Sequence, residues 1–183
     1  MTASPPPVPP AVRVSPAGRG DLPRILEIQK AAFRPEATVV GDPGIEPLTQ
    51  TLDDVLKDFG SSTVLKAAGP DGEILGSVRG RREAGVFVFK LSVDPAAQGR
   101  GCGTALMRAL ERALPARRYW LFTRSGNLPA MAVYLKLGYS LYKEEDAGLR
   151  LRFAYFEKLV PDGPDPEIPA PGSHVQGSGN PRP

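Results

Sequence analysis

Residues 98 to 103 read Gln-Gly-Arg-Gly-Cys-Gly and stand between an apolar stretch and an amphipathic one. This pattern predicts a turn from a strand into a helix. A helix N-terminus carries unpaired amide groups and a partial positive charge, and glycines let an anion approach the backbone closely. A tight turn that needs glycine only for its dihedral angles is the plainer alternative. Three glycines in five positions exceed what such a turn requires, so we expect a bound phosphate group.

Two common phosphate-binding loops do not fit this segment. A nucleoside-triphosphate loop needs Gly-Lys-Ser/Thr, and Gly103-Thr104 has no lysine between the two residues. A dinucleotide fingerprint has the spacing Gly-x-Gly-x-x-Gly in the first strand–helix unit. Here the spacing is Gly-x-Gly-x-Gly, and several predicted strands precede it. The ligand therefore belongs to another class of phosphate compound.

Composition excludes several other chemistries. The chain has one cysteine and one histidine, so a zinc site, a disulfide framework and a Ser-His-Asp apparatus in the core are all excluded. Cys102 shares the apolar stripe of the predicted helix with Ala105 and Leu106, which favours a buried structural thiol over a nucleophile. Any chemistry then rests on carboxylates, tyrosine, backbone groups or water.

Charge is concentrated in the middle of the chain. Residues 79–124 hold ten Lys and Arg against three Asp and Glu, a net charge of +7, whereas residues 11–78 hold seven against ten, a net charge of −3. A basic middle segment suits a ligand with several phosphates, although a solvated basic face would look the same. The aromatic residues interleaved with basic ones that single-strand binders use are missing, so we expect no nucleic-acid partner.

The ends differ in composition from the rest of the 183 residues. Residues 1–10 hold five prolines, and residues 161–183 hold seven prolines and four glycines, so we predict two disordered tails around a single domain at 11–160. No apolar run approaches the ~18 residues of a membrane helix. The N-terminus has no basic segment followed by an apolar one. We expect a cytoplasmic protein with no membrane partner.

Hydrophobic periodicity predicts alternating helices and strands. Residues 86–93 are apolar on both faces, which predicts a central strand with Phe87, Phe89, Leu91 and Val93 on one side. Before it, the sequence predicts a strand at 12–14, a helix from 22 to 33 capped by Asp21, and a loop at 34–47. A helix at 52–59, capped by Thr49 or Thr51 and closed by Gly60, and strands at 63–68 and 73–82 follow. After the central strand we expect a helix at 101–114, a strand at 119–123, a helix from 129 to 138, and a hairpin of 139–143 and 149–159 with its turn at 144–148.

Two segments together resemble a known family. Gln98-Gly99-Arg100-Gly101-Cys102-Gly103, preceded by Leu91-Ser92-Val93-Asp94-Pro95, resembles the acyl-coenzyme A signature Gln/Arg-x-x-Gly-x-Gly/Ala of the GNAT N-acetyltransferases. Further on, the segment from Asn127 to Tyr139 is similar to the family's Asn…Ala…Tyr-x-x-x-Gly-Tyr/Phe segment, with Tyr134 as its first tyrosine. The predicted order of elements from Val12 to Leu159 agrees with the same family.

The resemblance implies a fold and a coenzyme. The fold would be a mixed α/β (α+β) architecture with a mostly antiparallel sheet of six to seven strands, flanked by about four helices and splayed between the fourth and fifth strands. The cosubstrate would be acetyl-CoA, with no metal. Its pantetheine arm would lie in the gap beside Leu91, Ser92 and Val93, and its pyrophosphate would bind the amides of Gln98, Gly99, Arg100, Gly101, Cys102 and Gly103.

The resemblance also assigns catalytic roles. Tyr134 would protonate the departing thiolate, which a phenol with an ordinary pKa near 10 can do at neutral pH; simple packing of its ring is the alternative. Asn127 would contact the coenzyme, or would only cap its helix. An amide near Leu91 or Val93 would stabilise the oxyanion. Residues 86–93 contain no carboxylate, so the general base stays open among Glu73, Glu83 and water.

The expected function is therefore an acetyl-CoA-dependent N-acetyltransferase acting directly on a primary amine of a small molecule or peptide. The alternative is a non-catalytic acyl-CoA-binding sensor of the same fold. The acceptor would enter between the first two helices and the last hairpin, with residues 34–47 setting specificity and a homodimer left open. The acids that could attract a cationic amine there are Glu36, Asp42, Glu46, Asp53, Asp54, Glu144, Glu145 and Asp146.

Overall fold

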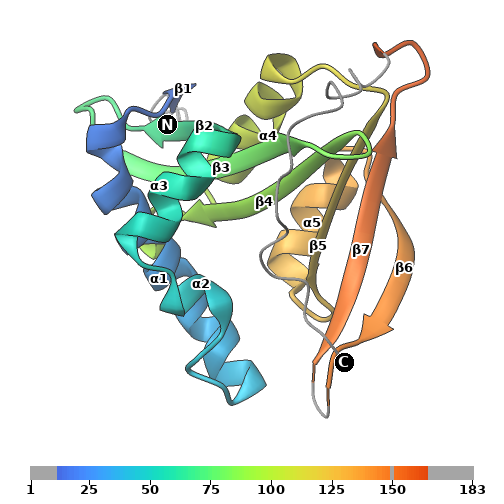
Figure 1. Ribbon diagram of the computed structural model, residues 1–183, viewed down its shortest axis with the longest axis horizontal. Helices are drawn as coiled ribbons and strands as arrows, with labels where there is room; N and C mark the ends of the chain where they lie inside the picture. Colours follow the sequence, from blue (N-terminus) through green and yellow to red (C-terminus); the bar gives the residue numbers. More distant parts are fainter. Residues whose placement is uncertain (1–11, 149–150, 165–183) are drawn as a thin grey trace, which may run out of the picture.

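A computed structural model describes residues 12–148 and 151–164 (Figure 1). Seven strands form one sheet in the order β1-β2-β3-β4-β5-β7-β6. Every neighbouring pair is antiparallel except β4 and β5, which are parallel. The predicted mixed α/β fold with a mostly antiparallel sheet is confirmed.

The elements begin and end close to the predicted positions. In chain order they are β1 (Arg13–Pro16), α1 (Leu22–Val40), α2 (Glu46–Thr49), α3 (Leu52–Ser61), β2 (Thr63–Ala68), β3 (Ile74–Arg82), β4 (Val86–Val93), α4 (Cys102–Ala113), β5 (Arg118–Arg124), α5 (Leu128–Lys136), β6 (Ser140–Asp146) and β7 (Arg152–Leu159). The predicted tails fall almost wholly on residues outside the described ones, as does the predicted start of the last strand at residue 149.

The sheet is divided in its middle. Two residue pairs join β4 to β5, Val86 with Tyr119 and Phe87 with Trp120, whereas β5 and β7 pair along seven residues from Arg118 to Arg124. Beyond Phe87 the two strands diverge (Figure 1). Parallel strands need a long crossover connection, and α4 lies in this one. The predicted splay between the fourth and fifth strands is thus present.

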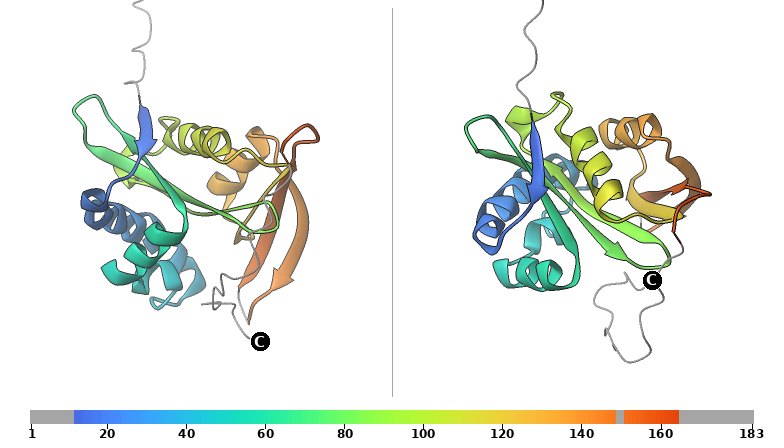
Figure 2. Two further views of the ribbon diagram at one scale, coloured as in Figure 1. Left: turned by 45° about the horizontal axis from the view of Figure 1, so that its top comes forward. Right: turned by 90° about the horizontal axis from the view of Figure 1, so that it is seen from above.

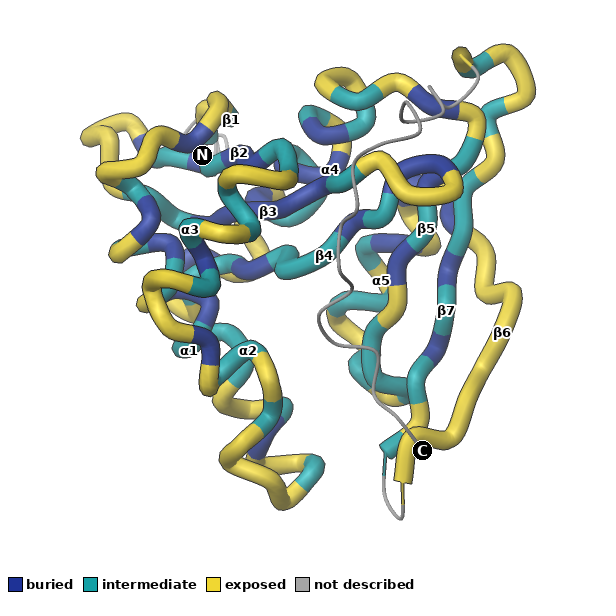
Figure 3. The backbone as a smooth tube through the Cα atoms, viewed as in Figure 1, coloured by how far each residue is buried: buried dark blue, intermediate teal, exposed yellow. Residues whose placement is uncertain are grey.

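Helices cover the sheet unequally (Figure 2). α4 and α5 lie on one face, where Leu106 and Leu110 of α4 and Tyr134 of α5 join the main hydrophobic core. α1 and α3 lie on the opposite face of the N-terminal half, around a smaller core that includes Ile25 and Val55. β6 is exposed along its whole length at the edge of the sheet (Figure 3). In residues 12–148 and 151–164, no helix lies on the face of β5, β7 and β6 opposite α5 (Figure 1).

The predicted loop at 34–47 is wrong in its first half. α1 continues through Pro35 to Val40 and ends at Gly41, whose φ of 75° is left-handed and whose amide donates to the Ala37 carbonyl at 2.9 Å. A proline inside a helix removes one backbone hydrogen bond. Ala37 is buried one half-turn further on, and this packing offsets the loss. The short helix α2 then interrupts the remainder of the loop.

Helix and strand ends show smaller differences. Thr51 caps α3 by exchanging hydrogen bonds with Asp54, as predicted, but Gly60 lies inside that helix instead of closing it. Asp21 precedes α1 without capping it, because its carboxylate accepts from the Gly18 amide and from Lys66. The predicted turn at 144–146 is the last part of β6. Local propensity alone does not determine where β6 ends, because its pairing with the next strand determines where the hairpin turns.

β4 contains an extra residue. Its register with β3 shifts by one between Ser77 and Arg79, and opposite this point Lys90 has a left-handed φ of 52°. These features define a β-bulge, which adds one residue to one strand and reverses the alternation of side chains beyond it.

The bulge makes one prediction about β4 wrong. Phe87 and Phe89 share a face and stack at 5.2 Å, as expected. Leu91 and Val93 instead lie on the opposite face, packed against the main core next to Gly103 at the start of α4. Strict period-two alternation assigns all four residues to one side, so the inserted residue is the cause of the error.

A buried polar network fastens α1 and α3 to β3. The Arg79 side chain is completely buried, and its guanidinium donates to Asp58 and, at 2.8 Å, to Gln29. Gln29 in turn donates to Gln50 at 2.8 Å. Burial lowers the pKa of Arg79, and the Asp58 carboxylate opposes that shift. The network therefore supplies hydrogen-bond and charge partners to the guanidinium, whose burial without them would strongly reduce the stability of the fold.

Gly76 of β3 is expected to be intolerant of alanine. An added Cβ would lie 2.6 Å from the Ser92 carbonyl oxygen and 3.3 Å from Val93 Cα, both backbone atoms of β4. Displacing packed backbone costs about 1–3 kcal/mol of unfolding free energy. Chemical denaturation of Gly76→Ala measures this loss. Gly20→Ala is the control because a Cβ there meets nothing within 4 Å; equal stability of the two variants would contradict the prediction.

None of the helices in residues 12–148 and 151–164 is long and apolar enough to cross a membrane.

Candidate functional site

The site lies where β4 and β5 separate. The loop of residues 98–101 leads from the end of β4 into α4, so the first turn of α4 lies beside the open edge of β4 (Figure 1). α5 follows β5 and approaches the same gap from the other half of the sheet. The two motifs of the sequence thus belong to different halves of the divided sheet: the glycine loop follows β4, and Tyr134 lies on the helix that follows β5.

The glycine loop presents its backbone outward. Gly99 and Gly101 have left-handed φ values of 76° and 81°, and an added Cβ at either residue would meet no atom within 4 Å. Gly103 has an ordinary φ, and a Cβ there would touch Val93 and Leu91 side chains at 3.8 and 3.9 Å. No amide of residues 99–104 donates to a carbonyl group in the described part of the chain. Free amides at the start of a 12-residue helix suit an anion.

Other residues of this loop have defined positions. The Gln98 side chain donates to the Val93 carbonyl at 3.3 Å and so holds the loop against the end of β4. Arg100 is exposed. Cys102 is buried, and burial raises the pKa of its thiol, which agrees with the predicted structural role and not with a nucleophile.

Within the described part of the chain, the edge of β4 toward β5 has no strand partner after Phe87. Leu91, Ser92 and Val93 lie on this stretch, directly before the glycine loop. Ser92 is buried and its hydroxyl donates to the Lys90 carbonyl at 3.2 Å. An extended ligand could therefore hydrogen-bond to this edge as a strand would.

Tyr134 is buried in α5 among aromatic side chains. Its ring lies 5.8 Å from that of Phe156 and 6.2 Å from that of Tyr139. Burial raises the pKa of the Tyr134 hydroxyl, and the Glu36 carboxylate raises it further. The phenol is therefore protonated at neutral pH and can donate a proton, even though its ring is also packed.

A salt bridge spans the opening near Tyr134. Glu36 of α1 accepts from Arg124 Nε of β5 at 2.6 Å and from Asn127 Nδ2 at 3.4 Å. The two charged side chains are only 18% and 16% exposed. Asn127 also caps α5, because its side-chain oxygen accepts from the Ala130 amide at 3.3 Å. The sequence gives no local signal for this contact, since Glu36 and Arg124 are 88 residues apart.

The two carboxylates suggested as general bases lie elsewhere. Glu73 stands before β3, half exposed, and pairs with Arg24 at 3.5 Å. Glu83 follows β3 near the joined end of β4 and β5, where it pairs with Arg81 at 3.3 Å and its carbonyl accepts from Trp120. Glu36 is the acid from the predicted acceptor region that approaches Tyr134. In the sequence, Glu36 is one of eight acidic residues expected near the acceptor, and nothing distinguishes it from the other seven.

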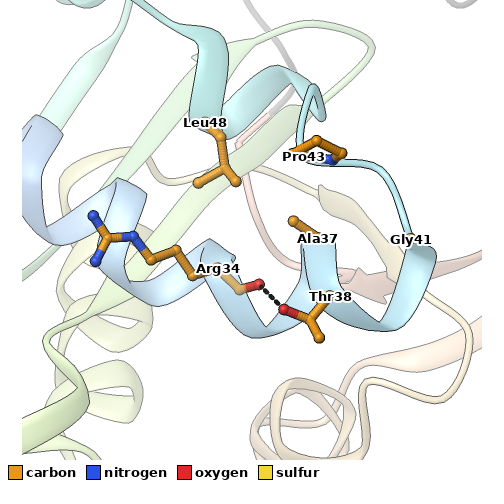
Figure 4. Close-up of a pocket in the computed structure, with 6 residues that line it drawn as sticks. All are labelled: Arg34, Ala37, Thr38, Gly41, Pro43 and Leu48. Atoms are coloured by element: carbon orange, nitrogen blue, oxygen red, sulfur yellow. Dashed lines mark hydrogen bonds between the residues drawn. The ribbon is translucent and has the colours of Figure 1, made fainter.

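Two further features border the N-terminal side of the opening. Glu46 pairs with Lys90 at the bulge of β4, and burial lowers the pKa of Lys90 while Glu46 opposes the shift. A hollow of about 410 Å³ lies between α1 and α2, lined mainly by apolar groups (Figure 4). Its lining residues are Arg34, Ala37, Thr38, Gly41, Pro43 and Leu48. It is separate from the glycine loop, so it is not the phosphate site.

A search of residues 12–148 and 151–164 finds no group of three or more His, Cys, Asp or Glu side chains able to hold a metal ion.

Comparison with known proteins gives a consistent result. Structures of 14–19% sequence identity superpose on the chain. The ribosomal-protein-S18-alanine N-acetyltransferase of Escherichia coli matches with a TM-score of 0.66 at 19% identity, covering 80% of this chain and 92% of its own. The phosphinothricin acetyltransferase of Sinorhizobium meliloti, solved with acetyl-CoA, matches with a TM-score of 0.66 at 19% identity, covering 81% and 88%. The PaiA N-acetyltransferase of Thermoplasma acidophilum, solved with coenzyme A, matches with a TM-score of 0.65 at 14% identity, covering 82% and 99%.

At such low identity these structures establish the fold. The comparison with curated proteins found no match. The sequence itself matches the model of the acetyltransferase (GNAT) family over residues 22–139, a span that includes α1, the strands β2 to β5, the glycine loop and α5. Because that span is well over half of the 183 residues, this chain belongs to the GNAT acetyltransferase family.

Proposed function

We propose that the protein transfers the acetyl group of acetyl-CoA directly to a primary amine. The observation that carries this proposal is the juxtaposition at the split sheet: free amides of the glycine loop on one side and the protonated Tyr134 on the other. Structural neighbours solved with acetyl-CoA or coenzyme A support the choice of cosubstrate.

Each part of the site has a role in this proposal. The amides of residues 98–103 bind the pyrophosphate, and exposed Arg100 adds a charge-assisted contact. The pantetheine arm hydrogen-bonds to the open edge at Leu91, Ser92 and Val93. Asn127 contacts the coenzyme in this proposal and also caps the N-terminus of α5. The glycine loop leaves room for the pyrophosphate, because a Cβ added at Gly99 or Gly101 would meet no atom within 4 Å.

The reaction follows from these positions. The amine nitrogen forms a bond to the thioester carbon, and an amide of β4 near Leu91 or Val93 stabilises the oxyanion. When the C–S bond breaks, the thiolate takes the proton of the Tyr134 hydroxyl, which solvent then restores. The amine proton passes to water, because Glu36 is already held by Arg124 and Asn127.

Binding and turnover test the proposal separately. Calorimetry with acetyl-CoA, coenzyme A and NAD, together with a free-thiol assay over a panel of small amines and short peptides, should give saturable binding of the first two ligands and thiol release with at least one amine. No binding would reduce the glycine loop to a turn. Binding of acetyl-CoA without thiol release on any amine would contradict the transfer step.

Two alanine substitutions in the glycine loop should distinguish the effect of backbone conformation on acetyl-CoA binding from the effect of an added methyl group. Gly101→Ala is expected to weaken acetyl-CoA binding about tenfold or more, since a left-handed alanine costs about 1–2 kcal/mol and the loop must turn to relieve it. Gly103→Ala adds the same methyl group where φ is ordinary, so its affinity should stay within about twofold of wild type. Calorimetric Kd values compare them; equal effects of the two changes would refute the argument.

A further inference from the structure

More than half of the aromatic residues lie outside both hydrophobic cores. The chain has seven Phe, five Tyr and one Trp. Eight of these thirteen belong to neither core, and all of them except Phe33 form a continuous set of ring contacts across β4, β5, β7 and β6. We call this set the aromatic platform; its members are Phe87, Phe89, Trp120, Phe122, Tyr142, Phe153 and Tyr155.

The platform begins where β4 and β5 join. Phe87 stacks on Trp120 at 4.3 Å and lies 5.9 Å from Phe122, so the rings bridge the two halves of the sheet. Phe122 then contacts Phe153 at 5.2 Å and Tyr155 at 5.5 Å. The platform's β5 and β7 rings alternate with Leu121, Ala154 and Phe156 of the main core, so they point to the other face of these strands, where the described residues form no helix (Figure 1). Phe122 is 42% exposed at its centre and Tyr142 is 41% exposed at its edge, an unusual arrangement for large apolar groups.

Charge around the platform is balanced. Three cations lie over its rings: Arg81 over Phe89 at 5.3 Å, Arg118 over Tyr142 at 5.5 Å and Lys143 over Tyr155 at 5.0 Å. Each also pairs with a carboxylate, of Glu83, Glu157 and Glu145 respectively. Each of these three cations is thus already neutralised by a carboxylate, which favours an uncharged aromatic group as the ligand of the rings.

The platform is continuous with the candidate active site. Trp120, Phe122 and Arg124 alternate along one face of β5, and Arg124 pairs with Glu36 beside Tyr134. Two residues of a strand span ~7 Å. A ring stacked at Phe122 therefore lies one alternate position away from Arg124, the residue that binds Glu36, and a primary amine on a short alkyl chain extends from the ring toward this ion pair.

From this arrangement we propose that the acceptor is an arylalkylamine, an aromatic ring joined to a primary amine by a short alkyl chain. This inference rests on the proposed function and adds the substrate class. The ring stacks on the platform around Phe122 and Trp120, and the amine reaches the gap between β4 and β5. Edge-on and offset contacts between rings add stabilisation beyond the area that they bury.

Amines matched in size test the class. For the wild-type protein, kcat/KM for 2-phenylethylamine should exceed that for propylamine about tenfold or more, and that for 2-cyclohexylethylamine should fall between them, because it buries similar area without a π system. Equal kcat/KM values for the aromatic and the aliphatic amines would overturn the inference.

Variants place the ring on the platform. Phe122→Ala should lower kcat/KM for 2-phenylethylamine about tenfold and change that for propylamine less than about twofold. Phe122→Leu should give an intermediate loss, since it keeps apolar area. Leu141→Ala is the matched control: this β6 residue is 46% exposed and lies opposite Phe156, a residue of the main core and not of the platform. An equal loss for both amines in Phe122→Ala would show that the residue only supports the fold, and would overturn the inference.

The single tryptophan reports binding without turnover. Trp120 emission should change saturably with 2-phenylethylamine and not with propylamine. If no amine releases thiol but this titration saturates, the proposed transfer fails while the ring site stands. If Trp120 does not respond, or if sedimentation shows a dimer whose formation shields Trp120 from quenchers, a second copy covers the platform and the inference is wrong.

Discussion

Replacing Tyr134 by phenylalanine is expected to lower kcat for acetyl transfer about 10²- to 10³-fold, the usual contribution of a positioned general acid. The substitution removes one hydroxyl from a ring that packs between Tyr139 and Phe156, so the packing should survive. The Kd for acetyl-CoA, measured by calorimetry, should stay within about twofold of wild type. Steady-state thiol release measures kcat.

Tyr139→Phe is the matched control for this experiment. It removes the same atom from a buried ring only 6.2 Å away, in the same hydrophobic core. Its kcat should remain close to that of wild type. If both variants lose activity equally, the hydroxyl of Tyr134 has no special role and its ring is simply packed.

The pH dependence of the wild-type protein gives a second check on Tyr134. Burial and the nearby Glu36 carboxylate raise the pKa of its phenol above the ordinary value of 10. The acid form is therefore complete throughout neutral and mildly alkaline solution, and kcat should show no alkaline decline that Tyr134→Phe abolishes below about pH 10. A decline between pH 7 and 9 that this variant removes would mean that the pKa of the phenol lies below its ordinary value of 10, opposite to the expected shift.

The largest loss of stability is expected from Arg79→Leu. Removing the buried guanidinium leaves the Asp58 carboxylate and the Gln29 and Gln50 side chains without their partner, and breaking a buried ion pair costs about 3–5 kcal/mol. Because the network joins α1 and α3 to β3, the N-terminal layer should loosen first. Urea denaturation followed by circular dichroism measures the free energy of unfolding.

Arg152→Leu provides the comparison with an exposed ion pair. Arg152 is 54% exposed and pairs with Asp146 at 2.9 Å, so its loss should cost less than about 1 kcal/mol. If the two variants are equally stable, the Arg79 network does not hold the layers together.

Much of the fold could be predicted from local patterns. The apolar stripe of α4 and the capping residues Thr51 and Asn127 gave helices that the structure contains. The predicted ends of elements were wrong where contacts with residues distant in the sequence determine them. Burial of Ala37 carries α1 past Pro35, and pairing with β7 extends β6 through Asp146.

The candidate site was predictable in one half only. Its glycines and Tyr134 stand in contiguous motifs, whereas the contact of Glu36 with Arg124 joins residues far apart and has no local signature. The aromatic platform did leave a signal, since Phe87 and Phe89, Trp120 and Phe122, and Phe153 and Tyr155 each stand two residues apart. Period two alone does not tell which strands are neighbours, so the pairs could not be joined into one surface.

The divided sheet also has a consequence for how the protein unfolds. Hydrogen bonds between strands connect its two halves at only two residue pairs, yet Leu106 and Leu110 pack in the same core as Leu121 and Phe156. Cooperativity between the halves is therefore transmitted through side chains and not along the backbone ladder. We therefore expect a single melting transition for the two halves, and a ligand bridging the gap would act as a thermodynamic cross-link that raises its midpoint.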